Sequence, residues 1–208
     1  PKNLYYYYKS WWTDEDVIHI SPHWNWNEKI GKPIDVWVNS NADNVELFLN
    51  GKSLGKKTMP KNSHLQWQVN YEPGKLEAVG YKKGKKITTK IETTSTPYKV
   101  VATTEKNIMT ADGKDATIVN ISIVDDKGRE VPVADNMVKF FLKGDAKIIG
   151  VGNGDPSSHE PDQYKDGAAW QRSAFNGKCQ VIILSGKTSS DILLEIKSNG
   201  LVSDQLTI

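Results

Sequence analysis

The segment SPHWNWN at residues 21–27 gathers side chains that can bind a sugar, hold a metal ion or build a buried corner. Its two indoles, Trp24 and Trp26, can stack on the apolar C–H groups of a sugar or fill a core with their N–H on a backbone carbonyl. In an extended segment both rings would lie on one side, with Asn25 on the other. We expect this two-indole wall to be mainly a structural corner. If one ring reaches a sugar instead, the candidate substrate-binding residues are His23, Trp24 and Trp26.

The segment GNGDPSSHEPDQYKDG at residues 152–167 is the one long irregular stretch, and such loops tend to be functional or disordered. Its carboxylates and carbonyls could hold calcium, but the alternating ligand spacing of an EF-hand loop is absent. We therefore expect a solvated loop that is ordered by its own Asp and Ser turns, without a metal ion. The acidic and histidine side chains of this loop are Asp155, His159, Glu160, Asp162 and Asp166.

No group of residues has the spacing of a catalytic site. Glycoside hydrolysis requires two carboxylates that face each other about 5 to 9.5 Å apart, and no acidic pair stands at the ends of predicted buried strands. The four histidines are scattered, and the sequence lacks a G-x-S-x-G elbow, a phosphate loop, a dinucleotide fingerprint and a zinc spacing. The single cysteine, Cys179, lies in the apolar segment CQVIIL and should be a buried hydrophobic residue. We expect no catalytic residues, no metal and no cofactor.

The composition is that of a folded globular protein. Of the 208 residues, 38 % are hydrophobic and 25 % are charged, a balance that neither a disordered chain nor a membrane span has. The net charge of +2 and the clustering of lysines in turn-like segments argue against a nucleic-acid partner. The sequence begins at Pro1 without a targeting segment, so we expect it to be an excised piece of a longer protein.

Helical periodicity is limited to residues 4–12, LYYYYKSWW, where Leu4, Tyr8 and either Trp11 or Trp12 share one face and Tyr5 lies beside it. These aromatic side chains are more than a lone terminal helix can bury. We therefore expect them to pack on the following domain or to be covered by another chain, with weak self-association as the consequence.

From Ile34 onward the hydrophobic period changes to two, which is typical of strands with one buried face. Asn50-Gly51 predicts a hairpin, because a type I′ turn needs positive φ at both central positions. Residues 17–93 are predicted to form an immunoglobulin-like β-sandwich of about seven strands. The Thr- and Pro-containing segment 93–97 suits a linker, and residues 98–208 predict a second immunoglobulin-like sandwich. The predicted fold is all-β, with two tandem sandwiches preceded by a short N-terminal helix.

The combination of YYYYKSWWTDEDVIHISPHWNW with SNADNVELFLNGKSLG, and later GVGNGDPSSHEPD with RSAFNGKCQVII, resembles the C-terminal region of family 2 glycoside hydrolases, the β-galactosidases. The resemblance covers essentially the whole chain. It implies that residues 1–16 are the remnant of the last helix of a catalytic barrel and that the two sandwiches are non-catalytic. The catalytic glutamates of this family lie on earlier barrel strands, so no residue here takes either role. The implied partner is the missing barrel of the same polypeptide, in the periplasm or outside a bacterial cell.

Two functions remain as hypotheses. The chain is either an accessory and scaffold region that braces the barrel and shapes the rim of its sugar pocket, or an independent carbohydrate-binding or adhesin-like module. The first is favoured, because an independent module has no reason to begin with an aromatic helix that nothing covers.

Overall fold

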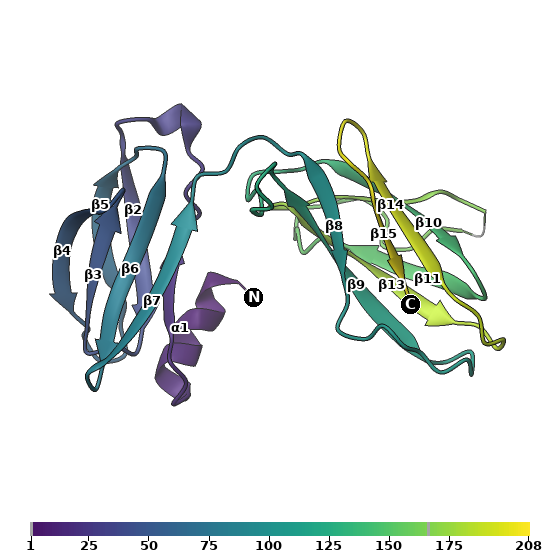
Figure 1. Ribbon diagram of the computed structural model, residues 1–208, viewed down its shortest axis with the longest axis horizontal. Coiled ribbons are helices and arrows are strands. Elements are labelled where there is room, and N and C mark those ends of the chain that lie inside the picture. The colour runs from purple at the N-terminus through teal and green to yellow at the C-terminus, as the bar shows by residue number, and fades with distance from the viewer. Residues whose placement is uncertain (1, 166) are drawn as a thin grey trace. The chain divides into compact units, whose positions relative to one another are not determined.

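The computed structural model describes residues 2–165 and 167–208. It divides into two compact units, Pro1–Thr93 and Thr94–Ile208 (Figure 1). Each unit contains two antiparallel sheets, and the helix α1 (Asn3–Trp12) belongs to the first unit. The predicted fold class, all-β with an N-terminal helix, is confirmed. Within the described residues, no helix is long and apolar enough to cross a membrane.

The first unit pairs a three-stranded sheet with a four-stranded sheet. Both sheets run in antiparallel register, and a short 3₁₀ helix, Asn27–Lys29, follows the first strand. The strands of the first sheet, in spatial order, are β1 (Ile18–Ser21), β2 (Pro33–Ser40) and β5 (Leu65–Asn70). Those of the second sheet are β4 (Lys52–Thr58), β3 (Asn44–Leu49), β6 (Lys75–Lys82) and β7 (Lys85–Glu92).

The core of the first unit follows the alternation in the sequence. In β2, Val36 and Val38 are fully buried, whereas the alternate residues Asp35 and Trp37 face outward. Alternate residues of the neighbouring strands complete one hydrophobic cluster, in which Trp24 is the largest fully buried side chain. Each buried aliphatic side chain of this kind contributes about 1.5 to 3 kcal/mol relative to exposure.

The predicted hairpin between β3 and β4 is confirmed. Asn50 and Gly51 have φ angles of 50° and 83°, the left-handed conformation that the type I′ turn requires. The Asn50 carboxamide oxygen also accepts a hydrogen bond from the backbone N–H of Lys75 at 2.8 Å. The turn residue therefore ties the β3–β4 hairpin to the beginning of the adjacent strand β6.

The second unit contains two four-stranded sheets around a core of alternating aliphatic residues. Cys179 lies in this core as expected, and burial raises the pKa of its thiol to about 12. One sheet consists of β12 (Trp170–Ser173), β10 (Met137–Lys143), β14 (Leu193–Ser198) and β15 (Asp204–Thr207). The other consists of β11 (Ala146–Gly152), β13 (Lys178–Ser185), β9 (Ala116–Val124) and β8 (Lys99–Thr103).

A buried carboxylate fixes the turn that follows β9. Asp125 accepts hydrogen bonds from the backbone N–H groups of Lys127 and Arg129 at 3.0 and 2.9 Å. Its Oδ2 also accepts from the Arg129 guanidinium at 2.8 and 2.6 Å and from the backbone N–H of Ser95 at 3.1 Å. Burial alone would raise the pKa of Asp125, but these hydrogen bonds outweigh it and hold the pKa well below its usual range.

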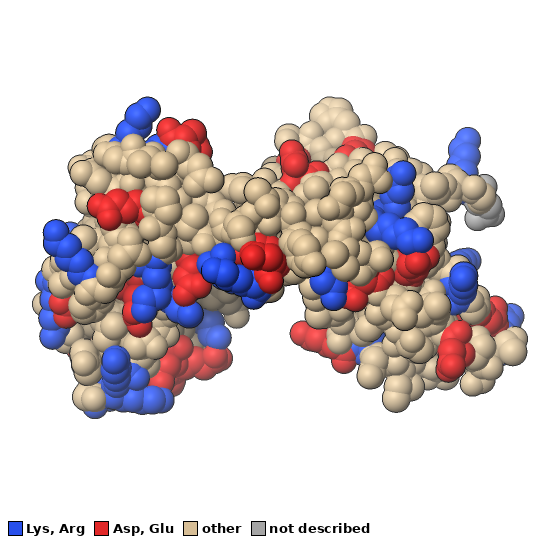
Figure 2. Space-filling model, turned by 45° about the horizontal axis from the view of Figure 1, so that its top comes forward, with Lys and Arg blue, Asp and Glu red and all other residues tan. Residues whose placement is uncertain are grey.

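Charged side chains are spread over the surface. On the face shown in Figure 2, Lys and Arg are interspersed with Asp and Glu. This distribution agrees with the small net charge of +2 and differs from the basic stripe of a typical nucleic-acid-binding protein.

Candidate functional site

The helix α1 is fixed to the first unit by the polar ends of two aromatic side chains. The Tyr7 hydroxyl donates to the carbonyl of Asn62 at 2.9 Å, and the Trp11 indole N–H donates to the carbonyl of Ser63 at 3.1 Å. Both carbonyls belong to the segment that precedes β5. The helix therefore lies over the three-stranded sheet with its position set by directed hydrogen bonds as well as by apolar contact.

A stacked pair adds to this attachment. The rings of Tyr6 and His19 lie 3.7 Å apart between centroids and are tilted by only 11°. The Nε2 atom of His19 is 3.0 Å from the carboxamide oxygen of Asn3. Burial lowers the pKa of His19 to about 4, so the imidazole under the helix is neutral at neutral pH.

The other face of α1 is apolar and exposed. The exposed fraction of Trp12 is 76 %, and its ring contacts that of Tyr8 one helical turn earlier at 4.5 Å. The residues of the predicted helical face therefore lie in two environments. Trp11 packs on the sandwich, where its indole N–H reaches a carbonyl, whereas Leu4 and Tyr8 stay exposed. The exposed apolar residues of the helix are Leu4, Tyr5, Tyr8 and Trp12.

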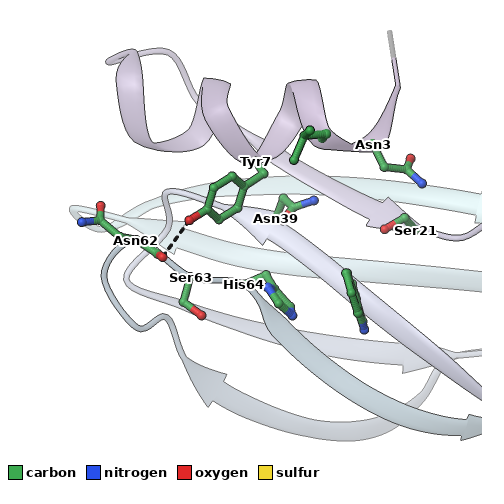
Figure 3. Close-up of a pocket in the computed structure, with 9 residues that line it drawn as sticks. Asn3, Tyr7, Ser21, Asn39, Asn62, Ser63 and His64 are labelled. Atoms are coloured by element: carbon green, nitrogen blue, oxygen red, sulfur yellow. Dashed lines mark hydrogen bonds between the residues drawn. The ribbon is translucent and has the colours of Figure 1, made fainter.

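A groove of about 520 Å³ opens between α1 and the outer face of the three-stranded sheet (Figure 3). This volume lies in the range of small-molecule sites. Figure 3 shows Tyr7 reaching from the helix to Asn62, with Asn39 beneath the helix. The described residues that line the groove include no Lys, Arg, Asp or Glu: they are Asn3, Leu4, Tyr7, Ser21, Trp37, Asn39, Asn62, Ser63 and His64.

The register of the sheet brings the floor of this groove together. Trp37 and Asn39 are two residues apart on β2 and so point to the same face. Ser21 on β1 pairs with Trp37, which places its side chain beside the indole. The sequence carries this signal in DVWVNS, because the residues that alternate with the buried valines must face outward. The sequence-based prediction covers the buried face of this strand but not the outward one.

Trp37 is a partly exposed ring held in a fixed position. Its exposed fraction is 45 %, and it stacks on the imidazole of His64 with centroids 4.5 Å apart and planes 25° apart. The flat face of such a ring can pack on the apolar groups of a ligand.

Two polar side chains of the groove have no hydrogen-bond partner within the described part of the protein. Asn39 and Ser21 are each only 5 % exposed. Within the described residues, neither the Asn39 carboxamide nor the Ser21 hydroxyl makes a hydrogen bond to another protein group. Their polar atoms are not among the fully buried atoms without a partner, so they are open to the groove and available to whatever occupies it.

The SPHWNWN segment forms a tight corner rather than the expected extended stretch. Residues 22–26 follow the end of β1 and contain no strand, because Pro22 has no N–H with which to continue the ladder. Trp24 is 1 % exposed, with its indole N–H on the carbonyl of Glu72 at 3.0 Å. Its ring meets that of Tyr71 edge-on at 5.0 Å. The largest residue of the corner therefore belongs to the core.

Trp26 is only partly buried. Its indole N–H donates to the carbonyl of His23 at 2.9 Å, and its ring stacks on the imidazole of His23 at 4.5 Å between centroids. The ammonium of Lys29 lies 4.3 Å from the centre of the same ring. Contact of His23, Trp24 or Trp26 with a substrate stays a prediction, and Trp24 has almost no exposed surface for it.

The long loop of the second unit is organised by one buried arginine. Arg172 is 4 % exposed and donates to the Glu160 carbonyl at 2.9 Å, to Asp162 at 2.9 Å and to the Asn153 carboxamide oxygen at 3.1 Å. Asp155 accepts from the backbone N–H of Ser157 at 2.9 Å, which is the kind of local turn that the sequence predicts. Asp166 lies outside the described residues. In the described part of the chain, no group of three or more His, Cys, Asp or Glu side chains could hold a metal ion.

Comparisons with known proteins show two families whose models match the sequence. The family described as glycoside hydrolase family 2 C-terminal domain 5 matches residues 100–207, more than half of the chain. A second family, described as a domain of unknown function (DUF4982), matches residues 31–88.

Similar proteins come from bacteria. The chain is 43 % identical over 204 residues to Beta-galactosidase BoGH2A of Bacteroides ovatus, and this match covers 97 % of the chain but 23 % of the relative. It is 42 % identical over 190 residues to a putative beta-glucuronidase of Formosa agariphila, covering 88 % of the chain and 18 % of the relative. Among solved structures, a beta-glycosidase from Bacteroides vulgatus matches with a TM-score of 0.93 and 35 % identity, over 100 % of this chain and 26 % of that one. The chain thus spans about a quarter or less of the length of these relatives.

Proposed function

Because this chain belongs to the family of glycoside hydrolase family 2 C-terminal domains, we propose that it is the non-catalytic accessory region of a longer β-galactosidase-like glycoside hydrolase. In that enzyme it braces the catalytic barrel, and hydrolysis takes place on the barrel. The sandwiches, residues 17–93 and 98–208, are scaffold in this proposal, and residues 1–16 are the last helix of the barrel.

The division of α1 into two faces carries this proposal. Tyr7 and Trp11 fasten the helix to the sandwich through hydrogen bonds of 2.9 and 3.1 Å. Tyr8 and Trp12 on the other side are exposed although both are aromatic. Contiguous exposed apolar patches are rare on monomeric proteins and mark contact surfaces. A helix that is fastened on one side and apolar on the other suits a position between two bodies.

The corner at residues 21–27 supports a bracing role. Trp24 is anchored in the core of the first unit, and the hydroxyl of Thr93 donates to the Trp24 carbonyl at 2.7 Å. The corner that follows β1 is therefore joined to the segment that leaves the first sandwich. Such a corner makes the end of β1 rigid, and β1 carries His19, on which Tyr6 of α1 stacks. Trp26, which is only partly buried, is the ring of this corner that can reach the rim of a sugar pocket in the longer enzyme.

The relatives differ in the substrates that their names state. One is a beta-galactosidase and another is a putative beta-glucuronidase, although their similarity to this chain is nearly equal. Substrate choice is therefore assigned to the barrel in our proposal. The chain itself contributes stability and the placement of surfaces around the barrel.

Assembly of separately produced parts tests the proposal. The longer enzyme is produced without the residues of this chain, and its unfolding temperature and hydrolysis of a chromogenic β-glycoside are measured with and without the added chain. Addition of the chain should raise both, and addition of the Trp12→Ser variant should raise them less. A truncated enzyme that is as stable and as active as the intact one, whether or not the chain is added, would contradict the bracing role.

A further inference from the structure

We propose that the groove between α1 and the outer face of the β1–β2–β5 sheet binds a neutral saccharide. Trp37 supports one face of a sugar ring, and the side chains of Asn39 and Ser21 bind its hydroxyl groups. This site is separate from the barrel contact proposed above and does not depend on it.

The aromatic floor of the groove has the properties of a sugar platform. The C–H groups on one side of a pyranose ring are apolar and pack on the flat face of an indole. Trp37 is 45 % exposed, and its stacking on His64 at 4.5 Å restricts its rotation before any ligand arrives. A ring that is already ordered loses little conformational entropy on binding, which favours affinity.

The polar groups that face the groove match the hydroxyl groups of a sugar. A carboxamide offers two donors and one acceptor oxygen, and a hydroxyl offers one donor and an acceptor oxygen. Asn39 and Ser21 are 5 % exposed and hydrogen-bond to no other protein group in the described residues. Their polar atoms are not among the fully buried atoms without a partner, so they are open to the groove. A ligand that presents hydroxyls to both can therefore hydrogen-bond to them without breaking a bond inside the protein.

The lining selects the class of saccharide. The residues around the groove are amides, hydroxyls, aromatic rings and one leucine, without Lys, Arg, Asp or Glu among the described residues that line it. Binding of a uronic acid or a sugar phosphate would leave its charge without a counter-charge, which is unfavourable in a partly enclosed site. A neutral hexose or a short neutral oligosaccharide fits the groove of about 520 Å³.

The groove and the exposed aromatic face of the helix are different surfaces. Tyr5, Tyr8 and Trp12 line a separate hollow with Lys9, Thr13 and Glu15, and none of these residues lines the groove. A body that covers Tyr8 and Trp12 therefore occupies the other side of α1. A saccharide on Trp37 and Asn39 and a protein contact on Trp12 have no lining residue in common.

Nuclear magnetic resonance titration of the ¹⁵N-labelled chain tests the proposal. The probes are lactose and cellobiose as neutral disaccharides and glucuronic acid as a charged sugar. We expect the neutral sugars to shift the indole N–H signal of Trp37 and the side-chain amide signals of Asn39. Trp37→Ala and Asn39→Ala should each weaken binding about tenfold or more, whereas Trp37→Phe should retain most of it. The matched control Trp12→Ala removes an exposed indole outside the groove and should bind as the unchanged chain does.

Several results would overturn the site. These are the absence of saturable shifts with either neutral sugar, equal or tighter binding of glucuronic acid, shifts confined to the Trp24–Trp26 corner, or equal weakening in Trp12→Ala. The dispersion of the amide spectrum shows whether each variant is folded, so a loss of binding is scored only in a folded variant. The bracing proposal fails on other observations, namely the stability and activity of the longer enzyme, so the two outcomes are distinguishable.

Discussion

Trp11 and Trp12 are neighbours in the chain but face opposite environments. Trp11 donates its indole N–H to the carbonyl of Ser63 at 3.1 Å, whereas Trp12 is 76 % exposed. Successive residues of a helix point about 100° apart, so one helix can hold a sandwich with one face and present aromatic rings with another. This relationship underlies our proposal that α1 lies between the accessory region and a catalytic barrel.

The exposed face of α1 should cause weak self-association of the chain on its own. Substitution Trp12→Ser removes the most exposed of its rings and should shift the weight-average sedimentation coefficient toward that of a monomer at high concentration. The free energy of unfolding should change by less than about 0.5 kcal/mol, because surface substitutions have small effects. A strict monomer in the unchanged chain, at all concentrations tested, would contradict this prediction.

The two tryptophans of the corner should differ in their contribution to stability. Trp24→Ala removes a ring that is 1 % exposed and should cost about 3 to 5 kcal/mol in the free energy of unfolding. Trp26→Ala should cost clearly less, because its ring is only partly buried and packs on His23. Urea denaturation of both variants measures the difference. If Trp24→Ala melted normally while the longer enzyme carrying it showed a greatly raised KM, the ring would serve the substrate rather than the corner.

The attachment of α1 should weaken at acidic pH. Burial lowers the pKa of His19 to about 4 from its usual 6.5, so the folded state favours the neutral imidazole. This contribution to stability is present in full above pH 6.5, the unfolded value, and is lost as the pH falls toward 4. The unfolding free energy of the unchanged chain should therefore fall across this window more steeply than that of His19→Gln, which cannot titrate. Burial also lowers the pKa of His23, so part of the pH dependence should remain in the variant.

The Asp125 carboxylate should be a major source of stability in the second unit. Asp125→Asn leaves Arg129 without its buried counter-charge and should cost about 3 kcal/mol, whereas the exposed Asp135→Asn serves as a matched control with little effect. Because the pKa of Asp125 is held well below its usual range, its contribution is present above the unfolded value of 3.8 and is lost only in stronger acid. Thermal unfolding at pH 7 measures the first effect. Equal losses of unfolding free energy in the two variants would show that the buried position of Asp125 adds no stability beyond that of an exposed aspartate.

The strands could be predicted from the sequence because burial on one face imposes a period of two. The segment ATIVNISIV corresponds to β9, Ala116–Val124, and the Asn50-Gly51 turn has the required positive φ angles. The groove could not be predicted in the same way. That Trp37 lies outside the core follows from the alternation, but its contact with His64 and its place under α1 depend on how segments far apart in the chain pack.

The same limit applies to the loop of the second unit. Its Asp and Ser turns, such as Asp155 with Ser157, are local and can be read from the sequence. The pairing of Arg172 with Asp162 and the Glu160 carbonyl joins the loop to strand β12, and no spacing rule indicates it. Trp24 and Trp26 illustrate a third case. An extended segment would place both rings on one side, but β1 ends before Pro22 and the two rings lie in different environments.

The measurement that tests our central claim most directly compares Trp12→Ser in two settings. The unfolding temperature is determined for the 208-residue chain and for the longer enzyme, each with and without the substitution. We predict almost no change in the chain, where Trp12 is 76 % exposed, and a decrease of several degrees in the longer enzyme, where we propose that the barrel covers this ring. A substitution that is equally harmless in both proteins would show that nothing packs on the exposed face of α1 and would contradict the bracing role.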